Sequence, residues 1–262
     1  MKNDSSKSLK TVVFLTCLAF LSAILPYGNA KGDDAFITFR LVTNFVDHAQ
    51  LAYNLSEPVY AFTSPLWFFI LSGLYLLVGN IFVAAYIASS IALVFAVISL
   101  WMMTGSLIDT RWLRISAIVF LLIDHWFMRW ALSGQEIAMK IGMVAFLIWL
   151  VSLHIHKTDN KWFRYVLTGV AFAAGLLTRP EIGLLLVVTI LVLVKEKQAQ
   201  GALVIFFTTG ALYSIWAVFC YFFFGEYLPH TILVKSANLA AGLQVMDMLR
   251  RVSHIPFPAC WV

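Results

Sequence analysis

The residues best suited to chemistry in this sequence are two adjacent carboxylates, Asp33 and Asp34. They follow the first apolar segment, residues 9–27, so they are expected to emerge close to a membrane surface. A carboxylate there accepts a proton from an attacking hydroxyl, and its hard oxygens also suit Mg²⁺, Mn²⁺ or Ca²⁺. Ionisable groups near a bilayer are costly unless they are used, so the pair is a candidate catalytic site. The structural alternative is that both acids only favour the start of a helix.

The composition indicates which elements must position this pair. Hydrophobic residues make up 61% of the 262-residue chain and charged residues only 12%, whereas soluble domains have about 25% charged residues. The mean hydropathy is +0.88. We therefore predict an all-α polytopic membrane protein. The net charge of +5 is explained by basic loops beside membrane spans, which argues against nucleic acid as a partner.

Seven apolar segments are candidate transmembrane helices, two of them short: residues 9–27, 81–104, 113–128, 137–153, 163–178, 182–194 and 202–224. Segment 65–79 is also apolar, but a helix of about 15 residues rises only about 22 Å, and a hydrocarbon core is about 30 Å thick. We expect an interfacial helix there, with Ser64 as its N-cap and Pro65 in its first turn.

Loop charges support this count of seven. With the N-terminus in the cytoplasm, the short Lys-rich and Arg-rich loops lie inside, as the positive-inside rule requires, and most carboxylates lie outside. Counting 65–79 as a span would place Lys157, Lys161, Lys195 and Lys197 outside, so we reject that count. The first segment has an alternative interpretation as a cleaved secretory signal, because Gly28-Asn29-Ala30 resembles a small-residue cleavage site.

The amino-acid sequence of the first outer loop resembles that of a known superfamily. Residues 33–67, DDAFITFRLVTNFVDHAQLAYNLSEPVYAFTSPLW, are similar to the first outer loop of the GT-C integral-membrane glycosyltransferases, and look most like the branch of the mycobacterial terminal arabinofuranosyltransferases. Asp33-Asp34 matches the acidic pair of that loop, and Pro65 matches the start of its interfacial helix. The turns at 130–136 and 178–181 extend the likeness to roughly residues 30–238.

The resemblance implies how the chain is organised. Residues 1–238 would form the transmembrane module, with an outer loop at 28–80 that holds juxtamembrane helices, and residues 239–262 would form a short tail. GT-C enzymes commonly continue into further helices or an outer soluble domain. We therefore expect this chain to be a truncated member.

The resemblance also implies roles for individual residues. Asp33 would be the general base, and Asp34 would orient the acceptor or hold a divalent cation against the donor phosphate. The candidates for binding the donor phosphate are Arg179, Lys235 and His230, and those for binding other parts of the substrates are Arg40, Glu136 and Glu181. Structural alternatives remain open, because Arg179 suits a snorkelling helix end or a pair with Glu181, and Glu136 is spaced to pair with Lys140.

The expected activity is inverting transfer of a sugar from a polyprenyl-phosphate donor to an acceptor, a cell-envelope glycan, lipid or protein. It would take place at the outer face of a bacterial inner membrane, beside membrane lipid. The alternatives are a transporter or flippase for a lipid-linked sugar, and an inactive truncated membrane subunit. Transporters place charges near the bilayer midplane, whereas segments 81–104 and 202–224 carry none.

Overall fold

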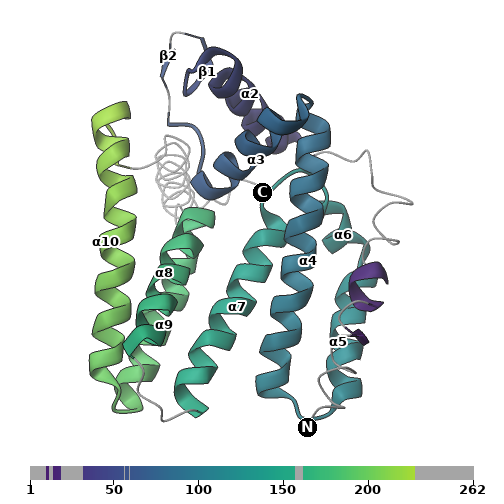
Figure 1. The fold of residues 1–262 in the computed structure, drawn as a ribbon, viewed down its shortest axis with the longest axis vertical. Coiled ribbons are helices and arrows are strands. Elements are labelled where there is room, and N and C mark those ends of the chain that lie inside the picture. The colour runs from purple at the N-terminus through teal and green to yellow at the C-terminus, as the bar shows by residue number, and fades with distance from the viewer. Residues whose placement is uncertain are drawn as a thin grey trace, which may run out of the picture.

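The fold was analysed in a computed structural model, which describes residues 10–11, 14–18, 32–55, 57–58, 60–156 and 162–227. Nearly all regular structure in these residues is helical, and the helices form a bundle capped at one end by smaller elements (Figure 1). The elements are α2 (Asp33–His48), β1 (Ala52–Asn54), β2 (Glu57–Pro58), α3 (Pro65–Val78), α4 (Ile81–Leu107), α5 (Arg111–Ile123), α6 (His125–Ala131), α7 (Ile137–His156), α8 (Trp162–Thr178), the 3-10 turn η1 (Pro180–Ile182), α9 (Gly183–Lys195) and α10 (Ala199–Phe224).

Three helices of the described residues are long and apolar enough to cross a membrane: Ile81–Leu107, Ile137–Ile155 and Ala199–Phe224. The chain is therefore an α-helical integral membrane protein. Helix α8 has 17 residues and α9 has 13, so they rise only about 26 and 20 Å. The predicted count of seven spans is not confirmed. Most of the predicted first span, 9–27, lies outside the described residues.

The predicted span 113–128 is wrong as a single helix. Helix α5 ends at Ile123, and Asp124 has an extended backbone before α6 begins. The Asp124 carboxylate accepts a hydrogen bond from the Phe127 amide at 2.5 Å, which is the geometry of an N-cap. A continuous apolar composition hid this break, because the cap occupies only one residue.

Small residues allow the long helices to pack closely. Helix α4 buries Ala84, Ala88, Ala92 and Ala96 at four-residue intervals, and a Cβ atom at Gly142 of α7 would lie only 2.6 Å from the Phe95 ring and 2.9 Å from Ala96 Cα. Close approach of backbones through such residues is the usual way in which membrane helices associate. Helices α8 and α10 meet in a similar way, where the Thr209 hydroxyl donates to the Gly169 carbonyl at 3.0 Å.

Helices α2 and α3 and the β1–β2 hairpin lie together at one end of the bundle (Figure 1). Helix α3 ends at Gly79, whose φ of +70° provides a left-handed cap. Pro65 stands in its first turn and Ser64 at its N-cap position, but the Ser64 side chain makes no capping hydrogen bond. Ser64 therefore occupies the predicted N-cap position without the usual capping hydrogen bond, and a place for α3 in the membrane interface stays a prediction.

The long helices run alternately away from and toward this end (Figure 1). Three of the candidate residues consequently lie at the α2–α3 end, since Asp34 is in the first turn of α2, Glu136 precedes α7 and Arg179 follows α8. Lys195 and Arg164 lie at the opposite end, where α9 stops and α8 starts. His154 also lies near that opposite end. It belongs to α7 and is buried, with a ring nitrogen 2.9 Å from the Thr168 hydroxyl.

Candidate functional site

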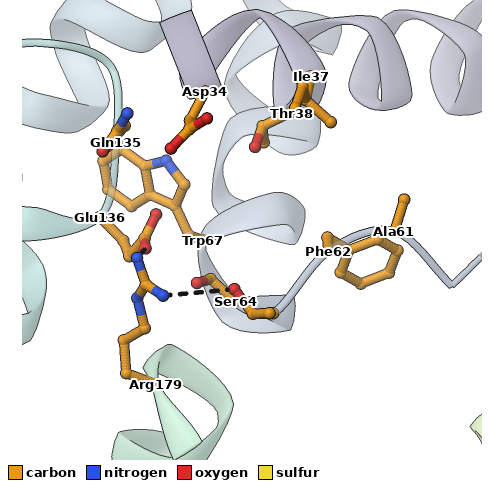
Figure 2. Close-up of a pocket in the computed structure, with 11 residues that line it drawn as sticks. Asp34, Ile37, Thr38, Ala61, Phe62, Ser64, Trp67, Gln135, Glu136 and Arg179 are labelled. Atoms are coloured by element: carbon orange, nitrogen blue, oxygen red, sulfur yellow. Dashed lines mark hydrogen bonds and ion pairs between the residues drawn. The ribbon is translucent and has the colours of Figure 1, made fainter. Parts of the chain in front are cut away.

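A pocket of about 230 Å³ opens at the α2–α3 end of the bundle. Four parts of the chain that are distant in sequence line it: the first turns of α2, the loop at 61–64 with the start of α3 that follows it, the turn at 135–136, and Arg179 (Figure 2). Asp34 and Glu136 supply carboxylates, Arg179 supplies a guanidinium, and Trp67 supplies an aromatic ring. The site therefore combines both signs of charge with hydroxyl groups and an apolar surface.

Arg179 is tied to two further segments of the chain. One guanidinium nitrogen, Nη2, forms an ion pair with Glu136 Oε1. The other, Nη1, lies 3.5 Å from the Thr63 hydroxyl and 4.0 Å from the Glu181 carboxylate. The Nε atom is buried and has no hydrogen-bond partner among the described residues. A quarter of the Arg179 side chain is exposed and it lines the pocket, so a ligand can reach the guanidinium.

Glu136 is the buried partner of this pair, with only 6% of its surface exposed. The preceding turn fixes its place, because Gly134 has a φ of +89° and its carbonyl accepts a hydrogen bond from the Trp67 indole at 3.0 Å. The Gly32 amide donates to the Ser133 carbonyl at 3.3 Å, which joins the start of α2 to the same turn. The turn thereby places α2, α3 and Glu136 around one pocket.

The structure separates the two adjacent acids. Asp34 lines the pocket together with Ile37 and Thr38, which follow it at three and four residues and share its helix face. Asp33 is exposed and is not among the lining residues. Neither carboxylate has an ion-pair partner in the described part of the chain.

Arg40, a predicted substrate-binding residue, is not brought to the pocket. Its Nε donates to the Tyr53 carbonyl at 2.9 Å, its Nη2 to Asn54 Oδ1 at 3.3 Å, and the guanidinium lies 4.6 Å from the centre of the Tyr53 ring. Arg40 therefore anchors the hairpin to α2. Glu181 lies at the rim, with 58% of its side chain exposed. Lys235 and His230 lie outside the described residues.

The sequence did not identify Thr63 as a pocket residue, and it indicated only a capping role for Ser64. One sequence feature could have indicated these residues: two hydroxyl residues followed by a proline, Thr63-Ser64-Pro65, stand immediately before an apolar helix. That loop is held by Tyr60, whose hydroxyl accepts a hydrogen bond from the Trp216 indole of α10 at 3.0 Å. Burial raises the pKa of Tyr60 far above its ordinary value, so its hydroxyl stays protonated.

The described residues offer few ligands for a metal ion. Asp34 and Glu136 are the carboxylates that line the pocket, and Glu136 is already paired with Arg179. Across the described segments, no group of three His, Cys, Asp or Glu side chains is placed to hold a metal. Because Mg²⁺ keeps several waters and needs only one or two carboxylates, Asp34 as a cation ligand stays a prediction.

A bundle of apolar helices with carboxylates and a guanidinium in a pocket at one end defines an α-helical membrane protein with a polar site at one end of its helices. A family model for dolichyl-phosphate-mannose-protein mannosyltransferase matches residues 62–224, more than half of the chain. The protein therefore belongs to this family of membrane glycosyltransferases, which supports its place in the GT-C superfamily. The arabinofuranosyltransferase branch is not confirmed. In the same comparisons, no curated protein and no solved structure matched.

The matched range includes Trp67, Glu136 and Arg179 but begins after Asp33 and Asp34. The family assignment therefore rests on the loop before α3 and on the helices, independently of the acidic pair. Asp34 is assigned to the site only because α2 places it in the lining of the pocket.

Proposed function

We propose that this protein transfers a sugar from a polyprenyl-phosphate donor to a hydroxyl acceptor outside the cytoplasm, with inversion at the anomeric carbon. The observation that carries this proposal is the pocket in which the Asp34 carboxylate and the Arg179 guanidinium lie on opposite sides (Figure 2). Membership in a glycosyltransferase family supports the reaction class. The proposal extends this class to a particular donor, acceptor side and stereochemistry.

The proposed reaction is a single displacement. The acceptor oxygen forms a bond to the anomeric carbon, and the bond from that carbon to the phosphate oxygen breaks. The electron pair of the broken bond leaves with the polyprenyl phosphate, and the acceptor proton passes to a carboxylate acting as general base. Negative charge grows on the phosphate as the bond breaks, so a cationic group on that side stabilises the transition state.

The proposed side of the membrane follows from charge. The end of the bundle opposite the pocket carries Arg111, Arg114, Arg164 and Lys195. Short basic loops favour the cytoplasm, so the pocket would face outward from the cytoplasmic membrane of a bacterium. The acceptor, a glycan, lipid or protein, would approach from that side.

Two carboxylates compete for the role of base. The resemblance of the first outer loop points to Asp33, whereas the lining of the pocket favours Asp34. We propose that one of these two acids removes the acceptor proton. Substitution of each in turn distinguishes them.

The test is transfer from radiolabelled polyprenyl-phosphate sugars in membranes that contain the protein, its Asp33→Asn variant or its Asp34→Asn variant. Loss of a general base typically lowers the rate about 10² to 10⁴-fold. One of the two variants should show this loss and still insert into the membrane. Asp124→Asn is the matched control, since it makes the same change at a helix start outside the pocket and keeps a good N-cap. Full transfer by both variants would exclude the acidic pair as the base.

A further inference from the structure

The N-terminus of α3 opens toward the pocket. Pro65 occupies the first turn and has no amide hydrogen, and the first described backbone bond of this helix runs from the Phe68 amide to the Ser64 carbonyl. A serine at the N-cap normally accepts a hydrogen bond from an amide of the first turn, but the Ser64 side chain makes no such bond here. The positive end of the helix dipole is therefore left for another acceptor.

The Ser64 hydroxyl is a second and independent feature of the same place. Ser64 lines the pocket but is only 7% exposed, and its Oγ has no hydrogen-bond partner among the described residues. Buried hydroxyl groups are normally hydrogen-bonded, so an unpartnered one at a pocket wall indicates a ligand contact. Figure 2 shows Ser64 beside Arg179, near the dashed line from the guanidinium to Thr63.

The groups that surround this point are mainly donors. The Ser64 and Thr63 hydroxyls and the start of α3 approach it from one segment of the chain, and the Arg179 guanidinium approaches it from another. Glu136 lies closer to Arg179 than Glu181 does, and it forms an ion pair with one guanidinium nitrogen, Nη2. The Asp34 carboxylate lies across the pocket on α2 (Figure 2). A ligand with several anionic oxygens is complementary to this side, as phosphates are at other helix N-termini.

We propose that the phosphate group of the donor binds at the N-terminus of α3, where it contacts the Ser64 and Thr63 hydroxyls and Arg179. This inference rests on the proposed function, and it fixes the direction of the substrates in the pocket. The leaving phosphate lies on the α3 side and the acceptor on the α2 side beside Asp34. The helix dipole and Arg179 both stabilise the charge that develops on the leaving group.

The experiment measures binding of farnesyl phosphate and of farnesol to the purified protein in nanodiscs, with no transfer reaction involved. Ser64→Ala should weaken binding of farnesyl phosphate about tenfold, since a hydrogen bond to a charged group is lost, and should leave farnesol binding unchanged. The matched control is Ser89→Ala. Ser89 is also buried and without a hydrogen-bond partner for its hydroxyl, but it lies within α4 and does not line the pocket.

Ser64→Asp separates an effect on folding from an effect on the ligand. Aspartate is as good an N-cap as serine, so α3 should keep its stability, measured as the melting temperature in nanodiscs. Its charge repels a phosphate, so farnesyl phosphate binding should fall at least as far as in Ser64→Ala. Unchanged affinity in both Ser64 variants would overturn the proposal, as would equal binding of farnesol and farnesyl phosphate.

Inorganic phosphate distinguishes a lipid phosphate from a free anion. It should displace farnesyl phosphate only at a large excess. If inorganic phosphate binds as tightly as farnesyl phosphate, the site serves a free anion and the proposal of a lipid donor at α3 is wrong. If the protein transfers sugar but its binding of farnesyl phosphate does not depend on Ser64, only the proposed phosphate site at α3 is refuted. Binding that depends on Ser64 without transfer of any sugar would refute the proposed function instead.

Discussion

At the residue scale, the contacts of Arg179 explain why its side chain would be difficult to replace. The guanidinium reaches Glu136, Thr63 and Glu181 at once, from the junction between α8 and η1. A lysine has a single ammonium group and cannot present the same planar fork to a carboxylate and a phosphate together. The alternative of a merely snorkelling Arg179 is less consistent with the ion pair to a buried carboxylate.

Arg179→Lys should therefore lower kcat/KM for the polyprenyl-phosphate donor about tenfold or more, because at least one charged hydrogen bond is lost. Arg129→Lys is the matched control, since Arg129 lies over the Trp126 ring at 5.6 Å and away from the pocket. Donor kinetics of both variants at equal expression check the prediction. Unchanged kinetics for Arg179→Lys would make Arg179 an interfacial anchor.

Three of the predicted site residues line the same pocket. Asp34, Glu136 and Arg179 lie together, although their roles stay predictions. Arg40 does not join them, because it follows Asp33 by seven residues and shares the face of Asp33 rather than that of Asp34. The partner of that face is the hairpin at Tyr53, and no sequence pattern indicates which segment folds back onto a helix.

At the scale of elements, the turn before α7 is the part of the site most sensitive to a small change. Gly134 has a positive φ, and a Cβ atom there would lie 2.6 Å from the Phe39 ring of α2. The carbonyl of the same residue holds the Trp67 indole. Any displacement of this turn therefore moves both α2 and α3, which carry opposite sides of the pocket.

Gly134→Ala should destabilise the protein by about 1–3 kcal/mol, because it adds strain in a left-handed backbone and a steric clash. Gly73→Ala in α3 is the control, because a Cβ atom there meets nothing within 4 Å and alanine favours a helix. Thermal unfolding in nanodiscs should show a lower midpoint for Gly134→Ala and an equal or higher one for Gly73→Ala. An unchanged midpoint for Gly134→Ala would contradict the described turn.

The sequence predicts where helices lie better than it predicts where a helix is interrupted. Segments 81–104, 137–153, 163–178 and 202–224 are helical with bounds close to those expected, because long apolar runs fix the type of element. The break at Asp124 was missed, since one cap residue decides it against an apolar background. The short hairpin β1–β2 was also missed. It holds only a few residues, and its place depends on Arg40 and Asn44 of α2.

At the scale of the whole molecule, the outer surface of the bundle indicates how it sits in a membrane. Only 17% of an apolar 18-residue stretch of α10 is buried. Large side chains such as Phe207, Ile215 and Phe222 are exposed. A soluble protein rarely exposes apolar surface on this scale. Lipid chains are the natural neighbours of this surface, with the pocket at one boundary and the basic loops at the other.

Accessibility to a reagent that cannot cross membranes tests this orientation. In a variant with Cys17, Cys220 and Cys260 replaced by alanine, His48→Cys at the pocket end should react with an impermeant maleimide added to intact cells. Glu196→Cys at the opposite end should react only after the cells are permeabilised. Both positions are exposed in the structure, so protection reports the membrane and not burial in the protein. The expectation follows from the basic residues that gather at the end of the bundle near Glu196.

Labelling of Glu196→Cys in intact cells, with His48→Cys protected, would mean that the pocket faces the cytoplasm and would require a cytoplasmic acceptor. Labelling of both in intact cells would mean that the helices between them do not cross the membrane as described.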